Sequence, residues 1–75
     1  MNTVTETTPS RFIRVREVLN RVGIGRSTLY DWINPQSPRF DCHFPKPVKI
    51  GANAVAWLES DIDEWIMQRV NANKL

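Results

Sequence analysis

Apolar residues recur with the spacing of one helix face over residues 15–22. They stand at positions i, i+3, i+4 and i+7, the pattern of a helix that buries one side: Val15, Val18, Leu19 and Val22. Gly23 follows at once, and glycine commonly ends a helix because it adopts positive φ without steric cost. The pattern therefore predicts a short first helix that ends at this glycine.

A second helix is predicted directly after this turn. Gly25 is an acceptable N-cap, and Ile24 gives the turn an apolar anchor. Pro35 and Pro38 prevent the helix from continuing. The predicted buried stripe of this helix consists of Leu29, Trp32 and Ile33. Two short helices around a glycine-containing turn indicate a helix-turn-helix.

A proline-rich segment and then a β-hairpin are predicted next. Residues 34–47 hold four of the five prolines, which indicates a shaped loop. Apolar residues then alternate with polar or small ones on both sides of a turn at residues 51–54: Val48 and Ile50, then Val55 and Trp57. This hairpin is the predicted wing of a mostly helical winged helix-turn-helix.

The last predicted helix has Ser60 as its N-cap and acidic residues in its first turn, where the helix dipole favours negative charge. Its apolar face should close over the helix-turn-helix and supply core: Ile62, Trp65, Ile66 and Val70. Residues 1–10 are polar and threonine-rich, so we expect a flexible N-terminal segment, followed by one winged helix-turn-helix domain over residues 11–72.

A length of 75 residues limits the chain to one small domain, and 41% apolar residues fit a globular protein. No apolar run is long enough for a membrane span, and no signal peptide is visible. The single cysteine, Cys42, excludes an internal disulfide and fits a reducing compartment. We therefore expect a cytoplasmic protein with no membrane partner.

The distribution of charge is more informative than the net charge of +2. Residues 11–30 contain five arginines and one glutamate, and residues 31–49 contain three basic and two acidic side chains. Residues 59–64 contain four acidic side chains and no basic one. The basic charge thus lies on the helix-turn-helix and the approach to the wing, which favours a nucleic-acid partner.

Double-stranded DNA is the predicted ligand of the second helix, whose N-terminal part would enter the major groove. The candidates on its outward face are Arg26, Ser27 and Tyr30, with Thr28 at the edge. Arginine pairs with guanine or phosphate, and hydroxyls donate to phosphates or base edges. The wing adds Lys46, Lys49 and Asn53, and the first helix adds Arg16. The alternatives are an ordinary solvated helix face and lysines that protect a strand edge.

The remaining aromatic, potential metal-binding and potential catalytic residues point to no further function. Trp57 and Trp65 are expected in the core, whereas Trp32 at the helix end is ambiguous. Asp41, Cys42 and His43 are adjacent and lack a second ligand pair at metal-binding spacing, so we expect no metal or other cofactor. No phosphate-binding glycine loop or catalytic triad is present, which argues against an enzyme.

Three sequence stretches together resemble the AlpA family of phage and prophage regulators: R-S-T-L-Y, F-P-K-P-V-K-I-G and A-V-A-W, followed by an acidic helix start. The resemblance spans about residues 11–70. It implies a winged helix-turn-helix similar to excisionases and MerR-type domains. It also implies sequence-specific DNA binding by a regulator on a mobile element. By position, Arg26, Ser27, Thr28 and Tyr30 match the start of the family's recognition helix, and Lys46 and Lys49 match its basic wing.

The chain departs from this family at four points. Gly25 replaces the usual serine, Asp31 stands where many members carry a basic residue, and Asn53 replaces a common arginine. The segment 34–43 is longer than in compact members, and its Arg39 is a candidate extra contact.

Three functions remain open at this point: a transcriptional regulator, an excisionase-like recombination directionality factor, and a protein-interaction module. Integrase or recombinase and RNA polymerase are the candidate protein partners. One copy would read few base pairs, so we expect a dimer or cooperative assembly on DNA.

Overall fold

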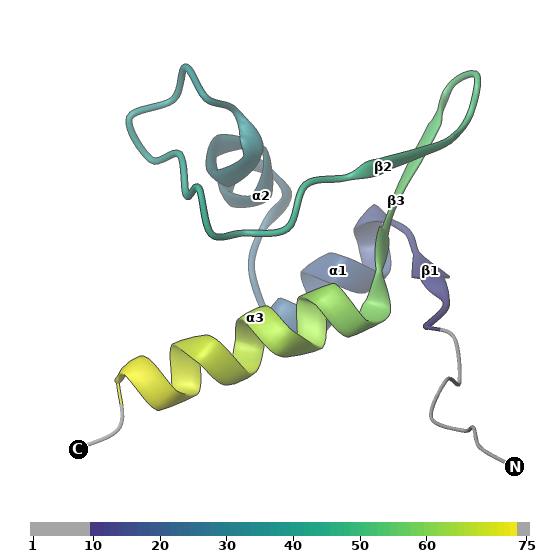
Figure 1. Ribbon diagram of the computed structural model, residues 1–75. Coiled ribbons are helices and arrows are strands. Elements are labelled where there is room, and N and C mark those ends of the chain that lie inside the picture. The colour runs from purple at the N-terminus through teal and green to yellow at the C-terminus, as the bar shows by residue number, and fades with distance from the viewer. Residues whose placement is uncertain (1–9, 74–75) are drawn as a thin grey trace, which may run out of the picture.

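The computed structural model describes residues 10–73. Within them lie three helices and a small antiparallel sheet, which confirms a mostly helical fold with a hairpin wing (Figure 1). The elements in chain order are β1 (Phe12–Ile13), α1 (Val15–Val22), α2 (Arg26–Ile33), β2 (Val48–Gly51), β3 (Ala54–Leu58) and α3 (Glu59–Ala72). Residues 1–9 of the predicted flexible segment lie outside the described residues.

The turn between α1 and α2 follows the prediction. Gly23 has φ of 82°, in the left-handed region, and its N–H donates to the Leu19 carbonyl at 2.8 Å. The Ile24 N–H donates to the same carbonyl at 3.2 Å, and the Ile24 side chain packs partly buried against the core. Glycine therefore ends α1 for the expected reason, because positive φ costs it little. The second helix ends at Ile33, two residues before Pro35, as predicted.

The sheet has the strand order β1-β3-β2. Its hairpin, β2 and β3, was predicted, but β1 was not, because two residues are too few to show a strand period. The register of β1 on β3 pairs Phe12 with Leu58 and Ile13 with Trp57. This short strand therefore attaches the start of the domain to the base of the hairpin.

The hairpin extends beyond the core as a separate projection (Figure 1). Its register shifts between Lys49 and Gly51 in β2, which marks an irregularity of the bulge type. Val48, Ile50 and Val55 are each at least 40% exposed, whereas Trp57 at the hairpin base is 1% exposed. Only the base of the hairpin is thus anchored by burial.

The start of α3 differs from the prediction. The helix begins at Glu59, and Ser60 is not its N-cap, because Leu58 holds that position without a side-chain hydrogen bond. The Ser60 N–H instead donates to the Ser10 hydroxyl oxygen at 2.7 Å, and the Glu59 N–H donates to the Arg11 carbonyl at 2.9 Å. The N-terminal segment therefore caps a helix 50 residues away in the chain.

Seven buried side chains form one core between the helices and the sheet: Ile13, Val18, Leu29, Phe44, Trp57, Ile62 and Trp65. This confirms Trp57 and Trp65 as core residues, and it confirms that α3 packs on the helix-turn-helix: α3 contacts α1, and its Trp65 ring lies 5.5 Å from the Trp32 ring of α2. The prediction for Val70 was wrong, because its side chain is 46% exposed where α3 runs past the other elements (Figure 1). Among the described residues, no helix is long and apolar enough to cross a membrane.

Candidate nucleic-acid interface

The second helix separates its buried and exposed residues as a recognition helix requires. Leu29 is fully buried, and Trp32 and Ile33 pack partly buried against the core. Arg26, Ser27 and Tyr30 are exposed and Thr28 is half-buried, so the outward face that the sequence predicted is present. The side chains of Arg26, Ser27 and Tyr30 are therefore available to an external ligand.

The N-terminus of α2 carries no side-chain cap. Gly25 is extended, with φ of −85°, and only its carbonyl takes part, accepting from the Leu29 N–H at 3.2 Å. The first backbone N–H groups of a helix have no partner inside the helix. Together with the helix dipole, they favour an anion at this end, beside the Arg26 side chain.

An aromatic cluster holds α2 against α3 and the loop that precedes the wing. The ring of Trp32 lies 5.5 Å from those of Phe44 and Trp65, and the latter two rings are 5.0 Å apart. Trp32 is therefore a packing residue that fixes the position of α2, which resolves the ambiguity left by its place at the helix end.

The wing carries three exposed polar side chains that the sequence predicted as contacts: Lys46, Lys49 and Asn53. Lys49 lies in β2 and Asn53 in the turn, while Lys46 lies just before the hairpin. The indole N–H of buried Trp57 donates to the Pro45 carbonyl at 3.1 Å, which fixes the backbone beside Lys46. The core and the wing are thus connected at Pro45, directly before Lys46.

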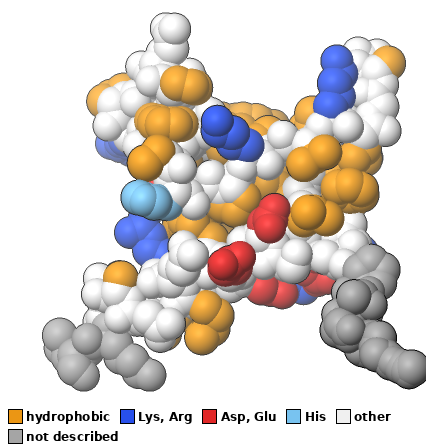
Figure 2. Space-filling model, in the orientation of Figure 1, with side chains coloured by type: hydrophobic (Ala, Val, Ile, Leu, Met, Phe, Trp, Pro, Cys, Tyr) orange, Lys and Arg blue, Asp and Glu red, His pale blue; other side chains and the backbone are white. Residues whose placement is uncertain are grey.

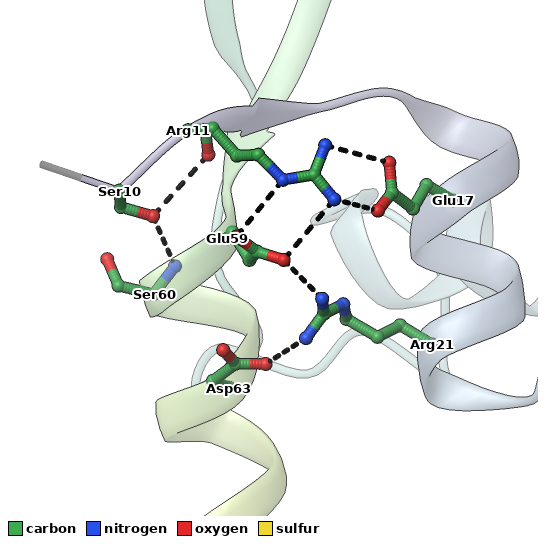
Figure 3. A network of polar contacts seen from close by, with 7 residues as sticks. All are labelled: Ser10, Arg11, Glu17, Arg21, Glu59, Ser60 and Asp63. Atoms are coloured by element: carbon green, nitrogen blue, oxygen red, sulfur yellow. Dashed lines mark hydrogen bonds and ion pairs between the residues drawn. The ribbon is translucent and has the colours of Figure 1, made fainter.

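The arginines of the N-terminal half divide into paired and unpaired groups. Arg11 lies between Glu17 and Glu59, and Arg21 pairs with Glu59 and with Asp63 at 2.6 Å (Figure 3). The hydrogen bond to Glu17, and the charges of Glu17 and then Glu59, raise the pKa of Arg11 above its ordinary value. These two arginines connect α1, α3 and the N-terminal segment.

Arg14 and Arg16 are exposed, and within residues 10–73 neither forms an ion pair. The sequence alone did not separate these roles, because all four arginines have similar local surroundings. Arg16 therefore remains a candidate contact, whereas Arg21 is engaged within the protein.

The four acidic side chains of α3 lie apart from the candidate contacts, whereas Asp31 lies on α2 itself. On the face drawn in Figure 2, acidic side chains gather along α3, below the two lobes formed by α2 with its following loop and by the hairpin. Two acidic residues of α3, Glu59 and Asp63, are neutralised by arginines. A polyanion would therefore meet less repulsion on the side of α2 and the hairpin than on the side of α3.

Of the three adjacent potential metal ligands, only Asp41 forms an ion pair within residues 10–73. The Asp41 carboxylate pairs with Arg69 at 2.8 Å and accepts from the His43 N–H at 2.9 Å. Burial raises its pKa, but the His43 N–H and the Arg69 charge outweigh this and leave the pKa below its ordinary value. Cys42 and His43 are exposed, and residues 10–73 contain no cluster of three His, Cys, Asp or Glu that could hold a metal.

Comparison with known proteins gives a consistent result. Residues 11–70 match the family described as "Prophage CP4-57 regulatory protein (AlpA)". The chain is 48% identical over 59 residues to the "DNA-binding transcriptional activator AlpA" of Escherichia coli (strain K12), covering 79% of this chain and 84% of that protein. It is 37% identical over 67 residues to "Uncharacterized protein ORF88" of Enterobacteria phage P4, covering 89% and 69%. No solved structure matches the chain.

Proposed function

Because the chain belongs to the AlpA family of prophage regulatory proteins, we propose that it is a sequence-specific DNA-binding transcriptional regulator of a prophage or related mobile element. The carrying observation is that an exposed polar helix face and a lysine-bearing hairpin project from one core, apart from the acidic helix α3. The relative in E. coli is itself described as a DNA-binding transcriptional activator.

In this proposal, the N-terminal half of α2 enters the major groove. Arg26 lies in the first turn, where it can bind guanine in bidentate fashion or a phosphate. Ser27 and Thr28 donate to phosphate oxygens or base edges, and the Tyr30 hydroxyl reaches the backbone. The uncapped N–H groups of the same turn favour a phosphate at the helix end.

The wing and α1 supply the flanking contacts. Lys46, Lys49 and Asn53 would contact the backbone or minor groove beside the site read by α2, and Arg16 would contact a phosphate. Phosphate neutralisation releases counterions, so affinity should fall steeply as salt increases. The protein acts by binding and not by catalysis, in the bacterial cytoplasm where its DNA lies.

One copy presents an eight-residue recognition helix, which spans only a few base pairs. We therefore expect two or more copies to bind neighbouring half-sites, as a dimer or cooperatively. RNA polymerase is the expected protein partner at a promoter, and an integrase is the expected partner at an attachment site.

The test is capture of sheared host genomic DNA by the purified protein at moderate salt, followed by sequencing. Sharp enrichment at promoters is the expected result, whereas peaks beside a recombination crossover would indicate an excisionase-like role instead. Absence of enrichment with a folded protein, at low salt as well, would refute the DNA-binding proposal and favour a protein-interaction module.

The residue assignment is tested by Arg26→Ala on an enriched duplex. If Arg26 reads a base, affinity should fall by about 1–3 kcal/mol, with relaxed preference at one base position. Gln68→Ala on α3 is the matched control and should bind as the wild type does. Unchanged binding by Arg26→Ala would remove this arginine from the interface.

A further inference from the structure

Asp31 lies on α2, yet its carboxylate is engaged by the following loop. The side chain is half-buried, unlike the exposed Arg26, Ser27 and Tyr30 of the same helix. Its Oδ1 accepts a hydrogen bond from the Ser37 hydroxyl at 3.3 Å. The negative charge on the recognition helix is therefore directed toward residues 34–43 and is partly screened by a donor.

The Ser37 hydroxyl has a second partner. While it donates to Asp31, its oxygen accepts from the backbone N–H of Arg39 at 3.1 Å. The Ser37 hydroxyl thus connects the Asp31 carboxylate to the backbone N–H of Arg39. Because Ser37 is half-buried, these hydrogen bonds are partly shielded from competing water.

Backbone hydrogen bonds complete the fixed conformation of this loop. The Ser37 N–H donates to the Asn34 carbonyl at 2.9 Å, and the Phe40 N–H donates to the Ser37 carbonyl at 3.1 Å. The Asp41 N–H then returns to the Trp32 carbonyl in the last turn of α2, at 3.0 Å. Residues 34–41 therefore form a loop that is closed on α2, so the Arg39 backbone is held relative to the recognition helix.

The Arg39 side chain projects outward from this loop. It is exposed and, within residues 10–73, makes no ion pair, in contrast to Arg11, Arg21 and Arg69. In Figure 1, α2 lies between the outer part of this loop and the hairpin, while the end of the loop returns toward α3, where Asp41 pairs with Arg69. A guanidinium at this position has its N–H donors available for a phosphate.

We propose that loop 34–43 is a second DNA-backbone arm, in which Arg39 binds a phosphate on the side of α2 opposite the wing and Asp31, through Ser37, positions it. This inference rests on the proposed DNA-binding function and extends it. Asp31 then has a supporting role at a position where a carboxylate facing DNA would be repelled. The wing lysines and Arg39 would contact the backbone on either side of the groove that α2 enters.

The expected magnitude follows from counterion release. Each phosphate contact contributes about 0.9 to the slope of log affinity against log salt. If the contact contributes to the binding free energy only through counterion release, Arg39→Ala lowers affinity about fivefold at roughly 0.15 M salt and about 15-fold at roughly 0.05 M. Ser37→Ala leaves all charges and the backbone hydrogen bonds of the loop in place but removes the hydroxyl that accepts from the Arg39 N–H, so it should cause part of this loss, about two- to threefold at roughly 0.15 M salt.

The experiment measures binding to a labelled duplex of about 30 base pairs, recovered from genomic DNA by the wild-type protein, at four salt concentrations. Arg39→Lys should retain the slope, and Gln36→Ala, in the same loop but outside these side-chain contacts, should match the wild type. Ser37→Ala combined with Arg39→Ala should bind no more weakly than Arg39→Ala alone, because both remove the same contact. Thermal unfolding of each variant verifies folding.

The salt slope separates positioning from simple destabilisation, because a smaller folded fraction lowers apparent affinity without changing the slope. An unchanged slope in Arg39→Ala would overturn the phosphate contact. Asp31→Ala should reduce the slope as Ser37→Ala does, whereas tighter binding at low salt with a steeper slope would show that Asp31 repels DNA instead. If the wild type captures no duplex, the proposed function itself fails, which is a distinct outcome.

Discussion

The N-terminus of α3 offers a stability test, because the local sequence and the tertiary structure assign the capping hydroxyl to different residues. The sequence favours Ser60 as the N-cap, but the Ser60 backbone N–H donates to the hydroxyl of Ser10. Removing that acceptor in Ser10→Ala leaves an N–H of the first turn without its protein partner. The Ser60 side chain is exposed and does not cap its own helix, so Ser60→Ala should be nearly neutral.

The loss of an N-cap hydroxyl costs about 1 kcal/mol, within a range of about 0.5–2 kcal/mol. For a domain of this size, about 1 kcal/mol lowers the unfolding midpoint by roughly 4–8 °C. We therefore expect Ser10→Ala to unfold roughly 4–8 °C below the wild type, and Ser60→Ala to remain within about 0.5 kcal/mol of it. Ser10→Thr, which retains a hydroxyl acceptor, should recover most of the difference.

The assay is thermal unfolding followed by circular dichroism at neutral pH, with urea unfolding as an independent measure. The urea m-value should stay constant, because the amount of surface exposed on unfolding hardly changes. The reasoning would be refuted if Ser60→Ala lost the larger share of stability and Ser10→Ala behaved as the wild type. That result would mean that the helix is capped locally after all.

Two further predictions concern the turn and the loop. Gly23→Ala should lower the free energy of unfolding by about 1 kcal/mol, because φ is 82° there. Gly25→Ser should raise it by a few tenths of a kcal/mol, because the added Cβ meets no atom within 4 Å and serine is a good N-cap. Urea unfolding of both variants checks this contrast. Asp41→Asn should cost about 0.5–1 kcal/mol at neutral pH through loss of the partly exposed pair with Arg69. Because the native pKa of Asp41 lies below its ordinary value of 3.8, this contribution is present above that value and disappears as the pH falls through the native pKa. Unfolding curves of the wild type and Asp41→Asn should therefore converge in acid, and a constant difference down to about pH 2 would contradict the assignment.

Local patterns in the sequence were sufficient for much of the fold. The i, i+3, i+4 spacing predicted α1 and the buried stripe of α2, and Gly23 marked the turn, because these features depend on residues within one or two helical turns. Alternation around a short turn predicted the hairpin for the same reason. The outward face of α2 followed from the position of Leu29, so the exposure of Arg26, Ser27 and Tyr30 was also predictable.

Other features depended on residues that are distant in sequence and adjacent only in the folded chain. Strand β1 exists because β3 offers an edge, and the cap of α3 comes from Ser10 across 50 residues. Arg21 differs from Arg16 only because Glu59 and Asp63 lie opposite it.

The same limit applied within α2. Asp31 turns toward Ser37, and Trp32 packs on Phe44 and Trp65, through contacts that no local period records. The sequence by itself thus determined which segments are helices and hairpin, since backbone propensity and amphipathic spacing act locally. Only the tertiary structure decided which charges are neutralised and which remain available to DNA, because that depends on what each side chain meets across the core.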